Sequence, residues 1–439
     1  MTDARTDTLL SHLAHQLPAT GTLWVGFSGG LDSTVLLHLL TRLQTTRGRL
    51  RAIHVNHGLS AHAADWQQHC AALCEHWQVP LISASVLVKN QGDGIEQAAR
   101  AARYEVYREH VTAGDTLLLA HHGDDQIETF FQRLLRGSGL AGLAAMPAQR
   151  ALAKGSVLLR PLLGCERQQL EAVAREAGLR WVEDESNQDE RFERNWWRNQ
   201  LLPQVFQRFP GRKASLLRSV EQWQQDQQLL DELLQPHTNQ CLRDVSWPST
   251  APLALDLSAL AALPAHWQPY VIRQWLLTLQ QAAPTQQWLQ TLMDDVVRAA
   301  DDAQPLLTLG TACIRRFRGC LYLQLPLADD CLRPRTVQLP QQTLLWGSGQ
   351  LQAVAASATY GLAAGEYLLT CAAEARGHSL RPLGRPAKNL KALFQEAGVP
   401  PWLRDQWPAL CQQDQLVALP GIACDQSVLC EGGTEYCWQ

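Results

Sequence analysis

The run Ser28-Gly29-Gly30-Leu31-Asp32-Ser33 follows a short apolar stretch that ends at Phe27. Glycine lets the backbone turn tightly and approach a ligand without Cβ atoms in the way. The next residues open a predicted helix, whose free N–H groups and positive dipole end favour an anion. The run therefore predicts a loop that binds pyrophosphate.

Asp32 gives this loop a chemistry different from that of the Walker loop, which ends in Lys-Ser/Thr and assists transfer of a γ-phosphoryl group. An aspartate would repel phosphate unless a divalent cation lay between them, so we expect Mg²⁺ to bridge Asp32 and the phosphates. The alternative is that Asp32 and Ser33 only cap the helix.

A second group of polar residues follows the apolar stretch that ends at Ala120, beginning with His121 and His122. A helix that starts there would place Asp125 and Glu128 on one face at i,i+3, with Asp124 beside them. These carboxylates are predicted to contact a substrate or cofactor. A transition-metal site and a simple helix-capping cluster are the alternatives.

Short apolar runs alternate with amphipathic stretches between Thr22 and Glu183, which predicts a doubly wound α/β fold with a mostly parallel sheet. The predicted strands are 23–27, 51–55, 81–86 and 116–120, and the predicted helices are 33–43, 61–77 and 94–110. Ligands of such sheets bind beyond the carboxyl ends of the strands, so the residues after Phe27, Val55 and Ala120 should converge on one crevice.

The rest of the chain predicts two further domains. Helical spacing at 216–234, 267–279 and 288–300 indicates a small helical domain, with β-like alternation at 312–325, and the proline-rich segment 326–340 resembles a linker. Short runs such as 351–355 and 367–371 indicate a β-rich domain containing one helix at 388–397. The predicted domains are 1–215, 216–325 and 341–439.

The composition is that of a globular protein: 439 residues, 46% hydrophobic and 18% charged. A net charge of −4 argues against a general nucleic-acid binder. The chain lacks a secretory signal and a run long enough to span a membrane, so we expect a cytoplasmic location. The twelve scattered cysteines are expected to be reduced and mostly buried, and Cys70 and Cys74 to pack rather than bind metal.

The block Ser-Gly-Gly-Leu-Asp-Ser resembles the PP-loop of N-type ATP pyrophosphatases. That resemblance implies that residues 28–33 bind ATP and that ATP is cleaved between its α and β phosphates. The AMP moiety would then pass to an oxygen of the substrate.

Further blocks resemble the tRNA(Ile)-lysidine synthase family in particular. They are His54-Val55-Asn56-His57-Gly58-Leu59, the segments 96–104, 120–129 and 133–140, Arg160-Pro161-Leu162-Leu163, Arg194-Asn195 with Arg198 and Leu202-Pro203, and the C-terminal segments 388–396 and 399–405. Where the family has Arg-Ile-Arg after the asparagine, this chain has Trp196-Trp197-Arg198.

This second resemblance implies the substrates and products. The C2 carbonyl of the wobble cytidine, in an isoleucine tRNA with a CAU anticodon, would be adenylated with release of pyrophosphate. The amine of free L-lysine would then displace AMP, forming lysidine and switching codon reading from AUG to AUA. Asp125 and Glu128 would hold the lysine cation or accept its proton.

Arg100 lies in the family's Ala-Arg block and would contact nucleotide or phosphate. The catalytic residues are thus predicted to be Asp32, Arg100, Asp125 and Glu128. A solvent-facing salt-bridge surface formed with Glu96 and Arg103 is the alternative for Arg100.

Two groups of cations could hold the RNA backbone. One surrounds Arg194 and Arg198, and the other runs from Arg376 to Lys391. The predicted RNA-binding residues are Arg194, Arg198, Arg381, Lys388, Lys391 and Arg404. A solvated charged surface is the alternative for each group.

Three other functions compete with this one. An enzyme that thiolates tRNA would commonly use paired cysteine motifs, and the chain has no Cys-x-x-Cys. An amidating synthetase acting on small molecules would not need the C-terminal cations, and a non-enzymatic binding module would not need Asp32, Asp125 and Glu128. The oligomeric state is not given by the sequence, and a homodimer is left open.

Overall fold

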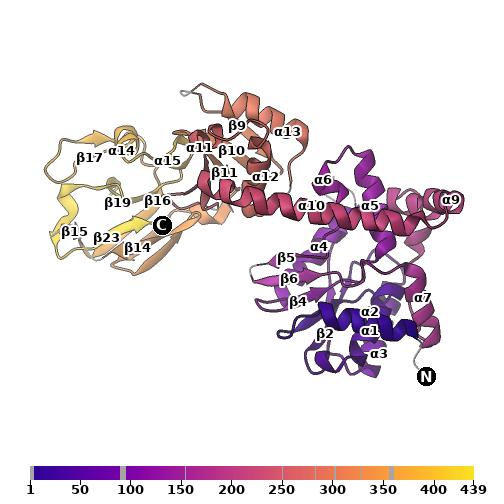
Figure 1. Ribbon diagram of the computed structural model, residues 1–439. Coiled ribbons are helices and arrows are strands. Elements are labelled where there is room, and N and C mark those ends of the chain that lie inside the picture. The colour runs from indigo at the N-terminus through magenta and orange to yellow at the C-terminus, as the bar shows by residue number, and fades with distance from the viewer. Residues whose placement is uncertain are drawn as a thin grey trace. The chain divides into compact units, whose positions relative to one another are not determined.

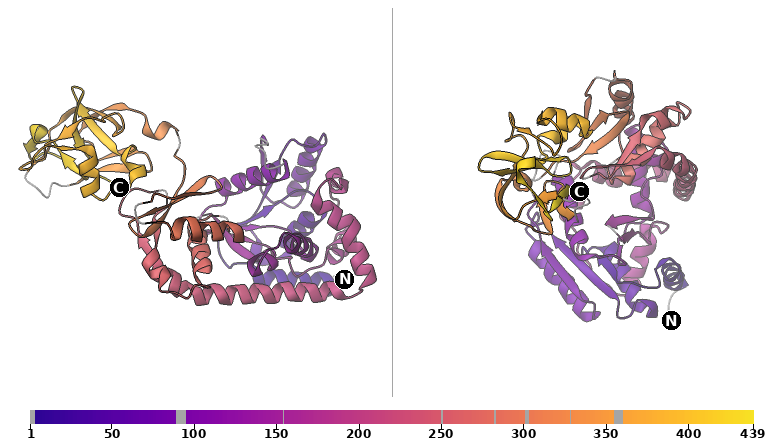
Figure 2. Two further views of the ribbon diagram at one scale, coloured as in Figure 1. Left: turned by 90° about the horizontal axis from the view of Figure 1, so that it is seen from above. Right: turned by 90° about the vertical axis from the view of Figure 1, so that its left-hand side faces the viewer.

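The computed structural model describes residues 4–88, 95–153, 155–249, 251–281, 283–300, 303–327, 329–354 and 360–439 (Figure 1). The chain divides into two compact units, Met1–Leu230 and Asp231–Gln439. Helix α10, Arg212–Cys241, runs through the boundary between them as one continuous helix (Figure 2).

The first unit is built on a six-stranded sheet in the order β3-β2-β1-β4-β6-β5. Its strands are β1 (Leu23–Gly26), β2 (Leu50–Asn56), β3 (Leu81–Ser85), β4 (Thr116–Leu118), β5 (Gln149–Ala153) and β6 (Ser156–Leu159). All neighbouring pairs are parallel except β5 with β6. The predicted α/β fold and its four parallel strands are confirmed, whereas the sequence analysis did not identify β5 and β6.

Helices cover both faces of this sheet. They are α1 (Ala4–Gln16), α2 (Leu31–Arg42), α3 (Ala63–His76), α4 (Ile95–His110), α5 (Gly123–Leu135), α6 (Leu140–Leu143), α7 (Arg167–Glu176), α8 (Glu193–Trp196) and α9 (Leu202–Arg208), with short helices η1 (Gln44–Thr46), η2 (Glu185–Gln188) and the π-helical η3 (Trp197–Leu201). The three helices predicted in this region are present as α2, α3 and α4. Gly94, where the last of them was predicted to begin, lies outside the described residues.

The side chains of β1 alternate between two hydrophobic cores, one on each face of the sheet. Leu23 and Val25 belong to a core shared with α1, α2, α3 and α7, while Trp24 faces a second core that contains Tyr104 and Tyr107 of α4. Successive strand residues point to opposite faces, so a short apolar strand buries both of its sides.

The second unit begins with a layer of helices on a five-stranded antiparallel sheet, ordered β7-β8-β11-β10-β9. These elements are β7 (Leu242–Asp244), β8 (Leu253–Asp256), α11 (Leu257–Ala261), α12 (Gln268–Thr278), α13 (Gln286–Thr291), the π-helical η4 (Leu292–Val297), β9 (Leu306–Leu309), β10 (Ala312–Phe317) and β11 (Cys320–Gln324). Trp275 is fully buried in their core, and its indole N–H donates to the carbonyl of Leu253. The predicted helices are present, and the sheet is larger than the β-like segment 312–325 indicated.

The remainder of this unit is rich in β-structure. Its elements are η5 (Asp329–Leu332), β12 (Arg335–Leu339), β13 (Thr343–Trp346), β14 (Gly349–Val354), β15 (Tyr360–Leu362), β16 (Gly365–Cys371), β17 (Ser379–Leu380), β18 (Lys388–Asn389), α14 (Leu390–Glu396), α15 (Pro401–Arg404), β19 (Pro408–Gln412), β20 (Gln415–Leu419), β21 (Ala423–Cys424), η6 (Gln426–Val428), β22 (Leu429–Glu431) and β23 (Glu435–Trp438). Strand β12 pairs with β16. Part of the segment interpreted as a linker therefore belongs to this β-structure.

Aromatic contacts join the two parts of the second unit. The ring centroid of Trp402 lies 5.8 Å from that of Phe317 and 5.9 Å from that of Tyr322, and the Arg315 guanidinium lies 5.4 Å from the Trp402 ring centroid. The loop after β10 and helix α15 thus share one packed contact.

All twelve cysteines lie within the described residues and are free thiols, as predicted. Five are buried, among them Cys70 and Cys74, and seven are half-buried, so burial is less general than the sequence analysis expected. In the described part of the chain, no helix is long and apolar enough to cross a membrane.

Candidate functional site

The loop between β1 and α2 has the backbone of an anion cradle. Gly29 adopts a φ of +81°, and a Cβ added there would meet the Cys70 Sγ at 2.8 Å. Helix α2 starts at Leu31 with Gly30 as its N-cap, and no described side chain caps it. The first N–H groups of the helix therefore keep their capacity to bind an anion.

The two serines of the loop hold its shape. The Ser33 hydroxyl donates to the Gly30 carbonyl at 3.1 Å and lies 3.0 Å from the Ser28 hydroxyl, which accepts from the Gly30 N–H at 3.3 Å. Neither Asp32 nor Ser33 occupies the N-cap position. The capping alternative therefore does not describe this loop. The Leu31 side chain packs in the core, so only its backbone can face a ligand.

Asp32 carries one carboxylate oxygen that nothing nearby satisfies. Its Oδ1 is buried without a hydrogen-bond partner among the described residues, while its Oδ2 lies 3.5 Å from the His122 Nε2. A buried anionic oxygen without a donor is costly and suits a hard cation, so the residues present fit Mg²⁺. Taking the described residues alone, no three His, Cys, Asp or Glu side chains are grouped to hold a metal ion.

His122 connects the loop with the second predicted cluster. Its ring is fully buried, and its Nε2 lies 3.5 Å from both Asp32 Oδ2 and Asp125 Oδ2. Burial lowers the pKa of His122, but the charges of Asp125 and Asp32 outweigh burial and raise it overall. Asp32 and Asp125, predicted from separate motifs, therefore meet at one imidazole.

The pKa of the neighbouring residue, His121, shifts in the opposite direction. Burial lowers the pKa of His121 to about 3, because the favourable charge of Asp125 is opposed by Arg160, Arg194 and Arg100. At neutral pH His121 is therefore uncharged.

Asp125 and Glu128 lie at the start of α5, both buried, and are held by two arginines. Glu128 Oε2 accepts from Arg194 Nε at 2.8 Å, and Glu128 Oε1 accepts from Arg198 Nε at 2.6 Å. Asp125 Oδ1 accepts from Arg194 at 2.6 Å and from Arg198 at 3.0 Å. These charge-assisted bonds satisfy both carboxylates. Burial raises the pKa of Asp125, but His122 and Arg194 outweigh burial and lower it well below its usual range.

Asp125 also has a structural role. Its Oδ2 accepts from the backbone N–H of His122 at 3.0 Å, which closes the first turn of α5. The capping alternative thus holds for one oxygen of Asp125, while the other faces the arginines. Asp124 differs, because its carboxylate accepts from Lys213 at 2.5 Å and from the Arg167 N–H at 2.9 Å.

Arg194 and Arg198 are supported by aromatic packing. Trp197, between them, is buried and stacks on Phe131 with ring centroids 5.5 Å apart. We predicted both arginines as RNA contacts, and in the structure they pair with the predicted catalytic carboxylates. The i,i+4 spacing of these arginines, with the large apolar residue Trp197 between them, is the sequence signal that could have indicated that both lie on one face of a helix.

Arg100 is exposed on α4, with its guanidinium 5.4 Å from the Tyr104 ring centroid. The side chain of Glu96, its predicted salt-bridge partner, lies outside the described residues.

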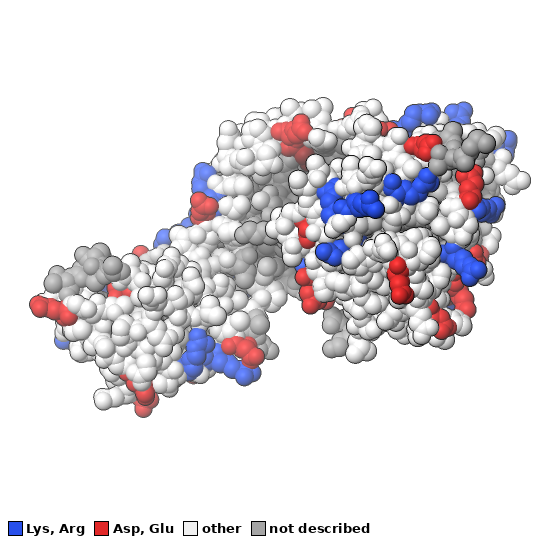
Figure 3. All heavy atoms as spheres, turned by 90° about the horizontal axis from the view of Figure 1, so that it is seen from below, with Lys and Arg blue, Asp and Glu red and all other residues white. Residues whose placement is uncertain are grey.

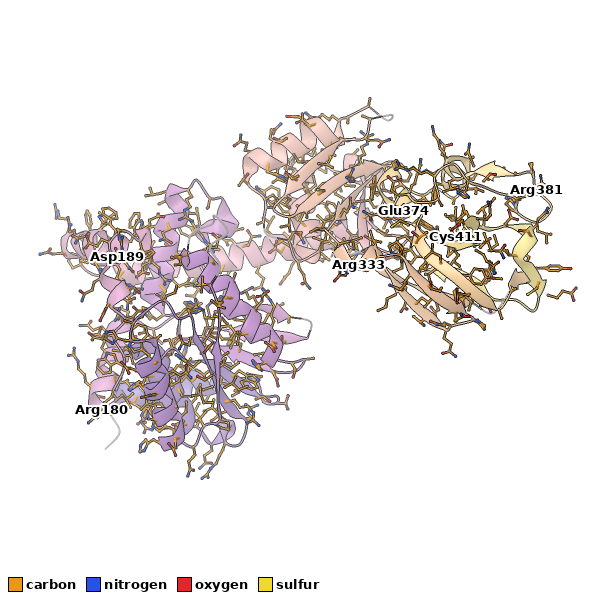
Figure 4. The ribbon with its side chains drawn as sticks, turned by 180° about the vertical axis from the view of Figure 1, so that it is seen from behind. Arg180, Asp189, Arg333, Glu374, Arg381 and Cys411 are labelled. Atoms are coloured by element: carbon orange, nitrogen blue, oxygen red, sulfur yellow. The ribbon has the colours of Figure 1, made fainter. Side chains whose placement is uncertain are left out.

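The predicted C-terminal cations lie in the second unit. Lys388 pairs with Glu396 at 2.5 Å, and the Arg404 Nε donates to the Val399 carbonyl at 3.0 Å. Arg381 lies close to strand β17 (Figure 4), and its backbone N–H donates to Asp425.

Lys391 and Arg404 line a cavity of about 680 Å³ together with Arg316 and Arg318. The lining residues include no Asp or Glu within the described chain. Burial, and next the charge of Arg318, lower the pKa of Arg404. Arg316 and Arg318 were not among the predicted cations, although the run Arg315-Arg316-Phe317-Arg318 is a local basic signal.

Charge on the first unit is mixed. The face seen from below has Lys and Arg side chains interspersed with Asp and Glu on the right-hand body (Figure 3). This agrees with a net charge of −4 and with selective contacts rather than a uniformly basic coat.

Three family models match the chain: a PP-loop domain over residues 3–205, a TilS substrate binding domain over 255–322 and a TilS substrate C-terminal domain over 369–438. A tRNA(Ile)-lysidine synthase of Serratia proteamaculans is 43% identical over 94% of this chain and 94% of that protein. Another, from Pseudomonas syringae, is 40% identical over 93% of each chain. A solved U34-tRNA thiolase from Methanococcus maripaludis is 18% identical, with a TM-score of 0.40, over 50% of this chain and 78% of that one.

Proposed function

This chain belongs to the tRNA(Ile)-lysidine synthase family, and from that premise we propose how its residues divide the work of an ATP-dependent ligase acting on isoleucine tRNA and lysine. The observation that supports the division is the meeting of Asp32 and Asp125 at His122, each 3.5 Å from the same imidazole nitrogen. One side of His122 is the anion cradle, and the other is the pair of buried carboxylates.

In the first step the cradle holds ATP. The N–H groups at the start of α2 face the phosphates, and Gly29 permits the close approach of the backbone. Mg²⁺ held by Asp32 would neutralise charge on the phosphates and on the leaving pyrophosphate. The target is the C2 carbonyl oxygen of the wobble cytidine in the CAU anticodon, which attacks the α-phosphorus and becomes adenylated as pyrophosphate leaves.

In the second step the lysine amine attacks C2 and AMP leaves. The amine must first lose a proton, and Asp125 or Glu128 can accept it. Both carboxylates bind Arg194 and Arg198 in the structure. We infer that the lysine ammonium competes with these guanidinium groups for the two carboxylates, so bound lysine replaces part of the arginine pair.

The RNA contacts remain proposals for Arg194, Arg198, Arg381, Lys388, Lys391 and Arg404. The cavity lined by Lys391, Arg404 and Arg318 supports a phosphate contact in the second unit, since clustered cations attract a polyanion. Lys388 is the weaker candidate because Glu396 already pairs with it. Arg100 is proposed to contact an anionic group of a substrate.

Three broader predictions also stay proposals: the division into domains 1–215, 216–325 and 341–439, a cytoplasmic location, and a homodimer as one assembly.

Thiolation of tRNA is disfavoured by the thiol nearest the cradle. Cys70 lies against Gly29, and burial raises the pKa of Cys70 to about 12, with Cys74 adding to the shift. Such a thiol stays protonated and is a poor nucleophile.

The decisive assay supplies purified protein with unmodified isoleucine tRNA bearing CAU, labelled lysine, ATP and Mg²⁺. We expect label in the tRNA together with AMP and pyrophosphate. Methionine tRNA, which also bears CAU, is the matched control and should acquire no label. ATP consumption with another acceptor and no lysine incorporation would reject the proposed function.

A further inference from the structure

A tight turn in the second unit holds Arg318 in a conformation that few residues adopt. Phe317, at the end of β10, pairs with Cys320, at the start of β11, so Arg318 and Gly319 form a two-residue turn. Both turn residues have a positive φ, +45° for Arg318 and +73° for Gly319. Such turns favour Asn, Asp or Gly, because a larger side chain is strained there. Strain of this kind is concentrated at ligand-binding sites, so Arg318 is a candidate contact residue.

The side chain of Arg318 lies between an aromatic ring and the end of helix α14. Its guanidinium carbon is 5.4 Å from the Phe317 ring centroid, and its Nη2 donates to the Gln395 carbonyl at 3.4 Å. Gly398 leaves room for this group, because a Cβ added at Gly398 would meet Arg318 Nη1 at 2.5 Å. The turn therefore presents a guanidinium group and an aromatic ring together.

Phe317 and Arg318 line the cavity of about 680 Å³ together with Lys391 and Arg404. Arg316 also lines this cavity, but it donates to the Val297 carbonyl at 3.1 Å and so forms part of the wall. Arg318 and Arg404 lie close enough that the charge of Arg318 adds to burial in lowering the pKa of Arg404. Like charges gathered at one cavity favour an anionic ligand.

The cavity is larger than a single phosphate group requires. A phosphate is comparable in size with a few water molecules, each of which takes about 30 Å³ in the liquid. Cavities of about 300–1,000 Å³ hold whole small molecules. A second cavity, of about 300 Å³, shares Lys391 and Arg404 with the first, whereas Phe317 lines only the larger of these two. The two shared cations therefore lie where the cavities meet, and the aromatic ring belongs to the larger one.

We propose that the larger cavity binds one whole unpaired nucleotide, base as well as phosphate. The phosphate contacts Lys391 and Arg404 where the two cavities meet. The base packs against the Phe317 ring and the Arg318 guanidinium, both of which are groups on which unstacked bases stack. A base inside a duplex is already stacked between its neighbours, so only an unpaired nucleotide can use this cavity. For its RNA ligand the site rests on the proposed function, and it adds a base contact to the phosphate contact proposed there.

Two ligands offer this chemistry: an unpaired nucleotide of the bound tRNA, and free AMP, which is a product of the proposed reaction. Two probes distinguish them, a single-stranded RNA of about five nucleotides and AMP alone. Each is titrated into the full-length protein without ATP or lysine, and a duplex RNA is the comparison. The first unit is also proposed to bind nucleotide, so the share of AMP bound by the second unit is the part that Arg318→Gly removes.

Arg318→Gly is the main test variant. Glycine accepts a positive φ, so the urea midpoint should not fall, whereas the affinity for single-stranded RNA should fall about fivefold to a hundredfold. Gln413→Gly is the matched control. Gln413 and Asp414, with φ of +51° and +59°, form the same kind of two-residue turn between β19 and β20 without lining the cavity. This control should leave the affinity for RNA unchanged.

Phe317→Leu keeps an apolar side chain but removes the aromatic face. The affinity for single-stranded RNA should fall about fivefold to tenfold, because stacking on the ring is lost. The slope of log K against log salt should stay the same, since no charge is removed. The affinity for duplex RNA should be nearly unchanged. The urea midpoint is measured in parallel because Phe317 also packs on Trp402.

The outcomes of these titrations are distinct. If Arg318→Gly loses only AMP binding, the ligand is a free nucleotide, and if it loses only single-stranded RNA binding, the ligand is a nucleotide of the tRNA. Loss of both means that AMP competes with tRNA for the cavity. No loss of either, or equal losses for single-stranded and duplex RNA, would overturn the proposal. Lysine incorporation is assayed separately, so a protein that binds these probes through Arg318 but incorporates no lysine would reject the proposed function alone.

Discussion

Arg198 donates to Glu128 through two nitrogens, with Nε 2.6 Å from Oε1 and a terminal nitrogen 3.0 Å from Oε2. Glu128 is 1% exposed, so this fork replaces the water that the carboxylate lost on folding. The contact between Arg198 and Glu128 should therefore contribute to the stability of the fold.

Removing the fork should destabilise the fold. Arg198→Ala leaves the Glu128 Oε1 buried with no guanidinium donor, and we expect the free energy of unfolding in urea to fall by about 1–3 kcal/mol. Because Arg194 still contacts Glu128, the loss is partial. Arg191→Ala removes an arginine from the exposed pair with Asp189 and should leave the unfolding midpoint unchanged. Equal losses in both variants would contradict a special role for the buried fork.

Asp32→Ala should abolish pyrophosphate release while leaving tRNA binding nearly intact. The change removes the buried oxygen that fits Mg²⁺ but touches none of the cations proposed for RNA. Asp65→Ala, which changes an exposed carboxylate near His62, is the control and should release pyrophosphate at the normal rate. Loss of tRNA binding in Asp32→Ala would show that the two roles are not separate.

Gly29→Ala should inactivate the cradle for two separable reasons. The added Cβ would meet Cys70 Sγ at 2.8 Å, and the φ of +81° strains any residue with a Cβ by about 1–2 kcal/mol. Adding Cys70→Ala removes the contact but leaves the strain, so ATP binding should recover only in part. Full recovery would mean that backbone strain is unimportant here.

The two histidines should affect stability in opposite pH ranges. The pKa of His122 is raised on folding, so its stabilising contribution is complete below about 6.5 and is lost as pH rises through the folded value. The pKa of His121 is lowered to about 3, so His121 destabilises the fold as pH falls below about 6.5, where only the unfolded chain gains the proton. Urea unfolding against pH should therefore show less acid sensitivity in His121→Gln and less alkaline sensitivity in His122→Gln.

Lys391→Ala combined with Arg404→Ala should weaken tRNA binding with a smaller salt dependence. Each lost phosphate contact should reduce the slope of log K against log salt by about 0.7–0.9. Arg333→Ala, in an exposed pair with Asp330 of the same unit, is the control and should not change the slope. An unchanged slope in the double variant would exclude this cavity as a phosphate contact.

The loop after β1 was the feature that could best be predicted from the sequence, because its structure depends on residues that are close together in the chain. The strand that ends before Phe27 and the glycines after it predict both the cradle and its position, because strand, turn and helix dipole are local properties. The clustering of Asp32 with Asp125 was predictable in outline from the shared edge of parallel strands.

The contact partners of individual side chains depend on tertiary packing, so they could not be predicted from the sequence. Arg194 and Arg198 look like surface cations by composition, and only the burial of Trp197 turns them toward Asp125 and Glu128. Strand β5 carries few large apolar residues, and β6 is only four residues long, so neither stood out from a loop. Arg160 likewise belongs to a family-like block, yet its position beside Tyr104 depends on the order of strands.

The contacts of His122 with both Asp32 and Asp125 lead us to expect that the affinities of the two substrates depend on each other. The negative charges of Asp32 and Asp125 both raise the pKa of His122. Mg²⁺ bound to Asp32 would offset the first of these charges, and a lysine ammonium bound to Asp125 would offset the second. Two ligands that act on the same titrating group are thermodynamically coupled, and each must change the binding of the other by the same factor. We therefore expect the nucleotide and the amino acid to change each other's affinity through a single imidazole.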